Sequence, residues 1–185
     1  MHTEKQINSE LKFDGYVIKV YLDTVELENG AVATRDVVRH KGAACVAPLT
    51  ENNELIMVRQ YRYALGRELL ELPAGKLDTK DEDPYLCAVR ELKEETGCTA
   101  DSIEYMGDFI STAGFCDENI RLYMATGLHM GESHLDEDEF LDVVKVPLEK
   151  AVEMVMSGEI IDGKTQALVL KVWKKMKNGE FKKQN

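Results

Sequence analysis

Three glutamates stand close together on one predicted helix, and their spacing suits the binding of metal ions. Glu91, Glu94 and Glu95 occupy positions i, i+3 and i+4, which places their carboxylates on one side of a helix. Like charges at this spacing repel, and acids near the carboxyl end of a helix oppose its dipole. Most acidic helix faces are simply solvated. A cluster that opposes its own helix instead favours a site for a hard cation such as Mg²⁺.

The residues around the cluster favour the same interpretation. Arg90 can offset part of the repulsion through an i, i+4 contact with Glu94. The loop upstream contains Ala74 and Gly75, whose backbone carbonyls are suited to completing a coordination shell.

The order of these residues resembles the Nudix box, the signature of a family that hydrolyses nucleoside diphosphates linked to another moiety. The matching pattern is Gly75-x6-Glu82-x7-Arg90-Glu91-Leu92-x-Glu94-Glu95-x-Gly97-Cys98. The family has one residue fewer between the glycine and the first glutamate. Either this loop holds an extra residue, or Asp81 takes the place of Glu82.

The resemblance implies a role for each residue of the box. Glu91 and Glu95 would bind the metal directly, and Glu94 would be a further ligand or would activate water. Arg90 would orient the carboxylates by ion pairing. The Ala74 carbonyl would be an additional metal ligand.

A second stretch resembles the ADP-ribose pyrophosphatase branch of the family. It comprises Val58-Arg59-Gln60-Tyr61-Arg62 and Glu71-Leu72-Pro73-Ala74-Gly75. The resemblance places Arg62 on the substrate diphosphate with Arg59 nearby, and an arginine fork suits phosphate oxygens. The alternative for Arg62 is a surface ion pair with neighbouring acids.

Four further positions are candidates. Glu137 and Glu139 precede a predicted strand, where related enzymes carry a glutamate that activates water or binds a further metal; the alternative is a solvated acidic loop. Arg35, in the N-terminal hairpin, would contact a base, although packing explains many such residues. The resemblance places Gly114 in a loop that binds substrate, although Ala113 replaces the proline typical of the branch and weakens the case for ADP-ribose.

The elements that must position these residues alternate between strands and helices. We expect a hairpin over 16–40, a second hairpin from strands 43–49 and 54–61, and strands over 68–73, 103–110, 120–126 and 140–146. Helices are expected over 84–96, 147–157 and 163–178, the first with Asp83 as its cap, Pro84 at its start and Gly97 after its end. Its buried stripe is predicted to comprise Tyr85, Ala88, Val89, Leu92 and Thr96.

This order predicts an α/β (α+β) fold, a Nudix-like α/β/α sandwich around a mixed β-sheet with an N-terminal antiparallel β-hairpin extension. We expect the extension at 1–40 and the catalytic domain at 41–185 of the 185 residues. The resemblance assigns the extension to dimerisation and base binding, and hence implies a homodimer.

The composition excludes several classes of function. A formal net charge of −11 disfavours nucleic-acid binding. The chain has no apolar run long enough to span a membrane and no signal-peptide pattern, so we expect a cytoplasmic protein without membrane contact.

The sequence therefore predicts Mg²⁺-dependent hydrolysis, with Mn²⁺ as an alternative metal. The substrate would be a small nucleoside diphosphate derivative, and ADP-ribose would give AMP and ribose 5-phosphate. The alternatives are a Nudix pyrophosphatase for another nucleotide sugar or dinucleotide, and a Nudix-like module that binds such a ligand without hydrolysing it.

Overall fold

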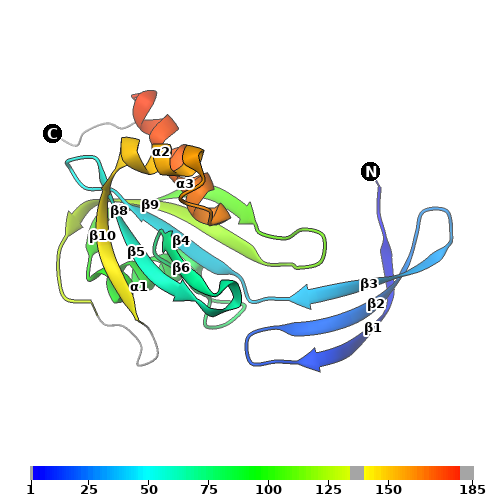
Figure 1. The fold of residues 1–185 in the computed structure, drawn as a ribbon. Coiled ribbons are helices and arrows are strands. Elements are labelled where there is room, and N and C mark those ends of the chain that lie inside the picture. The colour runs from blue at the N-terminus through cyan, green and yellow to red at the C-terminus, as the bar shows by residue number, and fades with distance from the viewer. Residues whose placement is uncertain (1, 134–139, 180–185) are drawn as a thin grey trace.

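The chain folds into a mixed α/β body with a separate N-terminal sheet (Figure 1). The structure is a computed structural model, which describes residues 2–133 and 140–179. The N-terminal sheet is antiparallel, in the order β1 (Lys5–Asp14), β2 (Lys19–Glu26) and β3 (Val32–Arg39). The expected hairpin over 16–40 is therefore present as β2 and β3. The polar segment before it adds a strand, β1, that its weakly alternating sequence did not predict. Val38 of β3 joins this sheet to the body, because its N–H donates to the Phe115 carbonyl at 2.7 Å.

The body is built from two sheets within the described residues. The first is mixed, in the order β7 (Ala74–Lys76), β4 (Ala43–Pro48), β9 (Asn119–His129) and β8 (Thr99–Ile110), with β4 and β9 parallel. The second is antiparallel, in the order β10 (Leu141–Pro147), β5 (Glu54–Arg62) and β6 (Arg67–Glu71). A short 3₁₀ turn, η1 (Tyr63–Leu65), connects β5 to β6.

Helices cover the mixed sheet on both faces (Figure 1). Successive side chains of β4 point to opposite faces, as in any strand, and all six of its residues are buried. Cys45 and Ala47 pack in the core beneath α2 (Leu148–Ser157) and α3 (Gly163–Lys177). Ala44 and Val46 pack in the core beneath α1 (Pro84–Thr96). This arrangement confirms the predicted α/β/α sandwich.

The boundaries of α1 agree with the prediction at both ends. The Asp83 carboxylate accepts a hydrogen bond from the Tyr85 N–H at 2.9 Å, which satisfies a donor that the helix leaves unpaired. Gly97 ends the helix in the left-handed conformation, with φ of 72°, and its N–H donates to the Lys93 carbonyl.

The buried face of α1 differs from the predicted stripe. Ala88, Leu92 and Thr96 are buried as expected, but Tyr85 and Val89 are 43% and 37% exposed. The helix is rotated so that Glu91 and Glu95 face inward together with Cys87. An apolar stripe predicts the buried face of a helix only where hydrophobic contacts alone decide how the helix is rotated. In α1 two carboxylates share the buried face, so the stripe did not predict it.

The expected second hairpin is wrong. β4 and β5 are consecutive strands, but β4 pairs with β7 and β9, and β5 pairs with β6 and β10. A single bridge between Leu49 and Leu55 joins their ends. The chain therefore passes from one sheet to the other at this turn, an arrangement that strand patterns alone do not distinguish from a hairpin.

The other elements lie close to their predicted ranges. β6, β8, β9, β10, α2 and α3 are all present, and the expected loop over 74–83 begins with the short strand β7. Among residues 2–133 and 140–179, no helix is both long and apolar enough to cross a membrane.

Candidate active site

A cleft of about 1080 Å³ opens where β6 and β7 meet α1 and the start of α3. Its walls carry both acids and cations. The charged residues that line it are His40, Lys41, Arg62, Glu71, Lys76, Asp78, Arg90, Glu91, Glu94, Glu95, Glu118, Asp162 and Lys164. A net acidic chain therefore gathers arginines and lysines beside its carboxylates, as a site for a metal-bound phosphate ester requires.

Two carboxylates form one wall of this cleft. Glu91 and Glu95 are only 7% and 3% exposed, because the inner face of α1 packs against β7. The Ala74 N–H donates to Glu95 Oε2 at 3.2 Å. The short strand β7 is thus fixed against the acidic face of the helix.

Gly75 is required for this close approach. A β-carbon built at position 75 would overlap the carboxylate of Glu91. The close approach of the carboxylate, and not a positive φ, therefore accounts for the glycine at this position.

Arg90 draws the acids of the helix and the loop together. Its Nη1 donates to Glu91 Oε1 at 2.7 Å and to Glu94 Oε2 at 3.2 Å. Its Nη2 donates to the Lys76 carbonyl and lies 3.6 Å from Glu82 Oε1. Burial by itself lowers the pKa of Arg90, but Glu91 and the other acids outweigh it and raise that pKa above its usual value.

Glu82 and Asp81 differ in their contacts within the loop between β7 and α1. Glu82 accepts a hydrogen bond from the Asp78 N–H at 2.5 Å and approaches Arg90. Asp81 is exposed, and it does not line the cleft. Of these two acids, Glu82 is the one that contacts Arg90 and the loop backbone, and neither lines the cleft.

A second charged cluster lines the same cleft as the α1 carboxylates. Glu71 is 1% exposed and accepts hydrogen bonds from Arg62 Nε at 2.9 Å and Arg62 Nη2 at 2.6 Å. Lys164 Nζ donates to Glu71 Oε2 at 2.9 Å and also lies 3.0 Å from Asp162 Oδ2. Burial alone raises the pKa of Glu71, but the Arg62 hydrogen bonds and the Lys164 charge outweigh it and lower the pKa to about 2.

The donor set suits a hard divalent cation in type. Two buried carboxylates contact one backbone loop, and Mg²⁺ prefers such oxygen ligands together with water and substrate phosphate. Within residues 2–133 and 140–179, no group of three or more acids, histidines or cysteines is arranged to hold a metal by itself. Carbonyl, water or substrate oxygens would have to complete a shell around Glu91 and Glu95.

Comparison with known proteins identifies the family. A family model described as "NUDIX domain" matches residues 38–168. The chain belongs to the Nudix family.

Relatives of this Nudix chain match it over most of its length. An ADP-ribose pyrophosphatase of Bacillus subtilis (strain 168) is 44% identical over 164 residues, 88% of either chain. A methanol dehydrogenase activator of Bacillus methanolicus has the same identity and coverage. An ADP-ribose pyrophosphatase of Mycobacterium tuberculosis (strain ATCC 25618 / H37Rv) is 38% identical, covering 92% of this chain and 84% of the relative.

A solved structure shares the Nudix fold. The crystal structure of an ADP compounds hydrolase superimposes with a TM-score of 0.83 and 20% sequence identity, covering 96% of both chains. This likeness confirms the predicted fold class, and the relatives agree with the branch that the sequence resembles.

Most of the residues expected from the Nudix box line the cleft. Arg90, Glu91, Glu94, Glu95 and Ala74 do so, and Arg62 joins them from the end of β5. Glu94 is the more open of the three glutamates, with a side chain 38% exposed.

Three predicted residues, Arg59, Gly114 and Arg35, do not line the cleft, and two others lie outside the described ranges. Arg59 is exposed on β5, one residue from Gln60, and alternation sends its side chain to the face opposite Gln60 and Arg62. Gly114 does not line the cleft. Glu137 and Glu139 fall within 134–139, outside the described residues.

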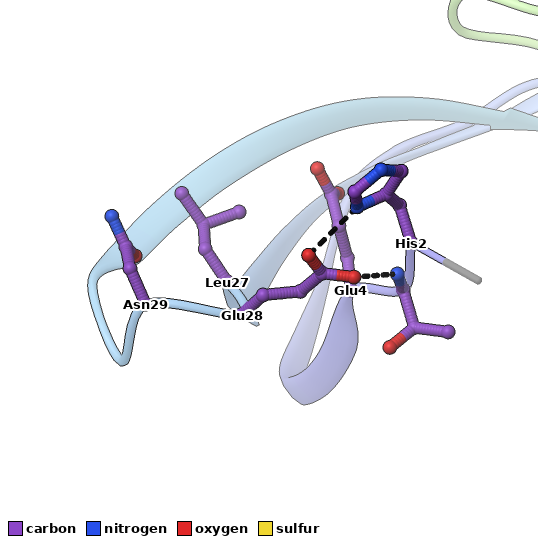
Figure 2. A pocket seen from close by; sticks show the side chains of 6 residues that line it. His2, Glu4, Leu27, Glu28 and Asn29 are labelled. Carbon is purple, nitrogen blue, oxygen red and sulfur yellow. Dashed lines mark hydrogen bonds and ion pairs between the residues drawn. The ribbon is translucent and has the colours of Figure 1, made fainter.

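Arg35, predicted to bind a base, pairs with Glu4 across the N-terminal sheet, with Nε to Oε2 at 3.0 Å. A shallow pocket lies near this pair, lined by His2, Thr3, Glu4, Leu27, Glu28 and Asn29 (Figure 2). It shares no lining residue with the Nudix cleft. Neither Arg35 nor Glu4 lines the Nudix cleft of the single chain.

Sequence reasoning missed Glu71, Asp162 and Lys164. Glu71 stands in the Glu71–Gly75 stretch that resembles the ADP-ribose pyrophosphatase branch, but that resemblance assigns it no role. Lys164 lies 93 residues from its partner Glu71 along the chain. The one local signal near Lys164 is the helix cap, since the Asp162 carboxylate accepts from the Thr165 N–H at 3.0 Å.

Proposed function

We propose that the chain is a metal-dependent Nudix pyrophosphohydrolase that converts ADP-ribose and water to AMP and ribose 5-phosphate. The observation that carries this proposal is the pair of buried carboxylates, Glu91 and Glu95, held against the Ala74–Gly75 backbone in a cleft that Arg62 also lines. Two relatives named as ADP-ribose pyrophosphatases, at 44% and 38% identity, support ADP-ribose as the substrate.

Glu91, Glu95 and the Ala74 carbonyl would hold Mg²⁺, or Mn²⁺ in its place. A divalent cation bound there would lower the pKa of a water and offset the charge of the diphosphate. Arg90 orients the carboxylates, because one of its nitrogens donates to both Glu91 and Glu94. Arg62 would hold the diphosphate through charge-assisted hydrogen bonds.

Three glutamates are candidates for the residue that accepts the proton of the attacking water. Glu94 lines the cleft and is partly exposed, so water can reach it. Glu137 and Glu139 remain candidates on resemblance alone. Comparing Glu94→Gln, Glu137→Gln and Glu139→Gln identifies the base as the variant with the largest loss of kcat and the least change in metal affinity.

We further propose that the chain is a homodimer and is cytoplasmic. Every residue of β1 is exposed in the single chain, including Ile7 at 55% and Phe13 at 58%. Exposed apolar side chains along a strand favour a protein interface. The cytoplasmic location is a prediction from the sequence.

The function is tested with a panel of substrates. Purified protein is incubated with ADP-ribose, an ADP-sugar, GDP-mannose and NADH, with and without Mg²⁺, and products are separated by chromatography. We expect ADP-ribose to have the highest kcat/KM and to yield AMP only when metal is present. A preference for GDP-mannose would replace the substrate but keep the family reaction; a relative at 30% identity carries that name.

The same panel tests a module that binds without hydrolysis. Absence of turnover for every compound, together with measurable binding of ADP-ribose, would support such a module and overturn the enzyme. Glu95→Gln is the control that shows whether turnover comes from this site. We expect its kcat to fall at least about a hundredfold, because a metal ligand loses its charge.

A further inference from the structure

The buried Glu71 carboxylate lies in the cleft where a diphosphate is proposed to bind. A fixed negative charge beside a polyanion opposes binding, so its presence requires a compensating role. Glu71 is 1% exposed and bonded to two cations. Its pKa of about 2 makes it a weak proton acceptor. A positioning role fits these properties better than general-base catalysis does.

The Arg62–Glu71 contact is a side-on pair. Nε and Nη2, which share one edge of the guanidinium group, each donate to one oxygen of the carboxylate. This pairing uses two of the five N–H groups of the arginine and fixes the plane of the group. The terminal edge, formed by Nη1 and the second proton of Nη2, is not used by this pair, and Arg62 lines the cleft.

Lys164 fixes the same carboxylate at Oε2, the oxygen that also accepts from Arg62 Nη2. Its side chain is 12% exposed, and its Nζ bridges Glu71 Oε2 and Asp162 Oδ2 at 2.9 and 3.0 Å. The start of α3 is held in place by a separate hydrogen bond, from the Leu72 N–H to Thr165 Oγ1 at 3.0 Å. Lys164 is therefore anchored at a rigid junction between α3 and the end of β6.

The charges of the cluster balance. Arg62 and Lys164 are positive, Glu71 and Asp162 are negative, and the group of four is neutral. Without Lys164, Glu71 would lose one of its two cationic partners and would hold Arg62 less firmly.

We propose that Lys164 and Glu71 are positioning residues that hold the guanidinium group of Arg62 in the orientation required to bind the substrate diphosphate. This inference rests on the proposed function, which places Arg62 on the diphosphate. Under this proposal Lys164 affects substrate binding through Arg62. The alternative is that Lys164 contacts the phosphate directly.

A double-mutant cycle separates the two modes of action. We expect Lys164→Met to raise KM for ADP-ribose about tenfold with little change in kcat, because ground-state and transition-state binding weaken together. If Lys164 acts through Arg62, the KM of Arg62→Ala/Lys164→Met equals that of Arg62→Ala alone within about twofold. A double variant whose KM reflects the product of the two single effects would overturn the proposal, as would a folded Lys164→Met with unchanged KM.

The variants have matched controls. Lys175→Met also removes an α3 lysine that is paired with an acid, Glu104, but outside the cleft, and we expect its KM to stay that of the wild type. Lys164→Arg keeps the charge and is expected to recover most of the affinity. Should Lys164→Met fail to fold, Glu71→Gln provides the same cycle with Arg62, since it keeps the shape of the side chain and removes the charge.

Two further measurements separate this proposal from the substrate assignment. The first is the Kd for inorganic pyrophosphate, measured by calorimetry on the same variants. We expect the Kd of the double variant to equal that of Arg62→Ala, whichever nucleotide derivative the enzyme hydrolyses. In the protein without ligand, the Nε–H signal of Arg62 in ¹⁵N NMR should be protected from solvent exchange and lose that protection in Glu71→Gln and Lys164→Met. An unprotected Arg62 signal in the wild type would overturn the positioning role, whereas an inactive panel with a protected signal would overturn only the function.

Discussion

At the scale of single residues, the cleft depends on how closely Gly75 approaches Glu91. We predict that Gly75→Ala lowers kcat/KM at least about tenfold, because its methyl group would displace the Glu91 carboxylate from its place beside the loop and small displacements in an active site are costly. Hydrolysis of ADP-ribose is measured as a function of Mg²⁺ concentration, and we expect a higher metal requirement. A variant with wild-type activity and metal demand would show that the Glu91 position is not needed.

The lowered pKa of Glu71 leads to a second prediction, which concerns how stability depends on pH. Its pKa in the folded protein, about 2, is below its usual value of 4.5, so its contribution to stability is complete above about pH 4.5 and is lost as the pH falls toward about 2. The advantage of the wild type over Glu71→Gln in free energy of unfolding should shrink by about 2 kcal/mol between about pH 7 and about pH 3. Urea unfolding of both proteins at the two pH values measures this difference. An equal difference at both pH values contradicts the assigned role of the charge.

The residues of the site differ in how far the sequence could reveal them. Glu91, Glu94 and Glu95 were found because helical spacing alone brings them to one face. Glu71 and Lys164 were not, because their partnership depends on how α3 packs against the end of β6. Local periodicity contains no information about such a contact between distant segments.

At the scale of elements, α1 is the helix whose limits matter most, since it supports the carboxylates. We predict that Asp83→Ala lowers the free energy of unfolding by about 1 kcal/mol, because the Tyr85 N–H loses its acceptor. Urea unfolding measures the loss, and KM for ADP-ribose should stay near that of the wild type, since Asp83 does not line the cleft. The control is Asp81→Ala in the same loop. Equal destabilisation by both substitutions would exclude capping as the cause.

Element limits were easier to predict than element pairing. The cap, proline and glycine around α1 are local signals, and its predicted range of 84–96 is correct. The strands 43–49 and 54–61 were also located, yet they belong to different sheets. Pairing is decided by which distant strand completes the sheet, here β9 for β4 and β10 for β5.

At the scale of the whole molecule, the N-terminal sheet has a different surface from the body. The two faces of β4 are buried beneath helices, whereas β1 is exposed along its whole length. The link between this sheet and the body includes the backbone pairing of Val38 with Phe115 and Asp117. Some of the apolar surface of the sheet therefore has no cover within the described chain, and a second copy would provide it.

This argument leads to a prediction about assembly. Light scattering after size exclusion should give twice the chain mass of 20.9 kDa, and Phe13→Asp should reduce it toward the monomer, because a charge in an apolar interface is costly to bury. Leu86→Asp is a matched control, since Leu86 on α1 is 58% exposed, the same as Phe13, but lies outside the N-terminal sheet. A monomeric wild type, or dissociation by Leu86→Asp in place of Phe13→Asp, would show that the N-terminal sheet is not the interface.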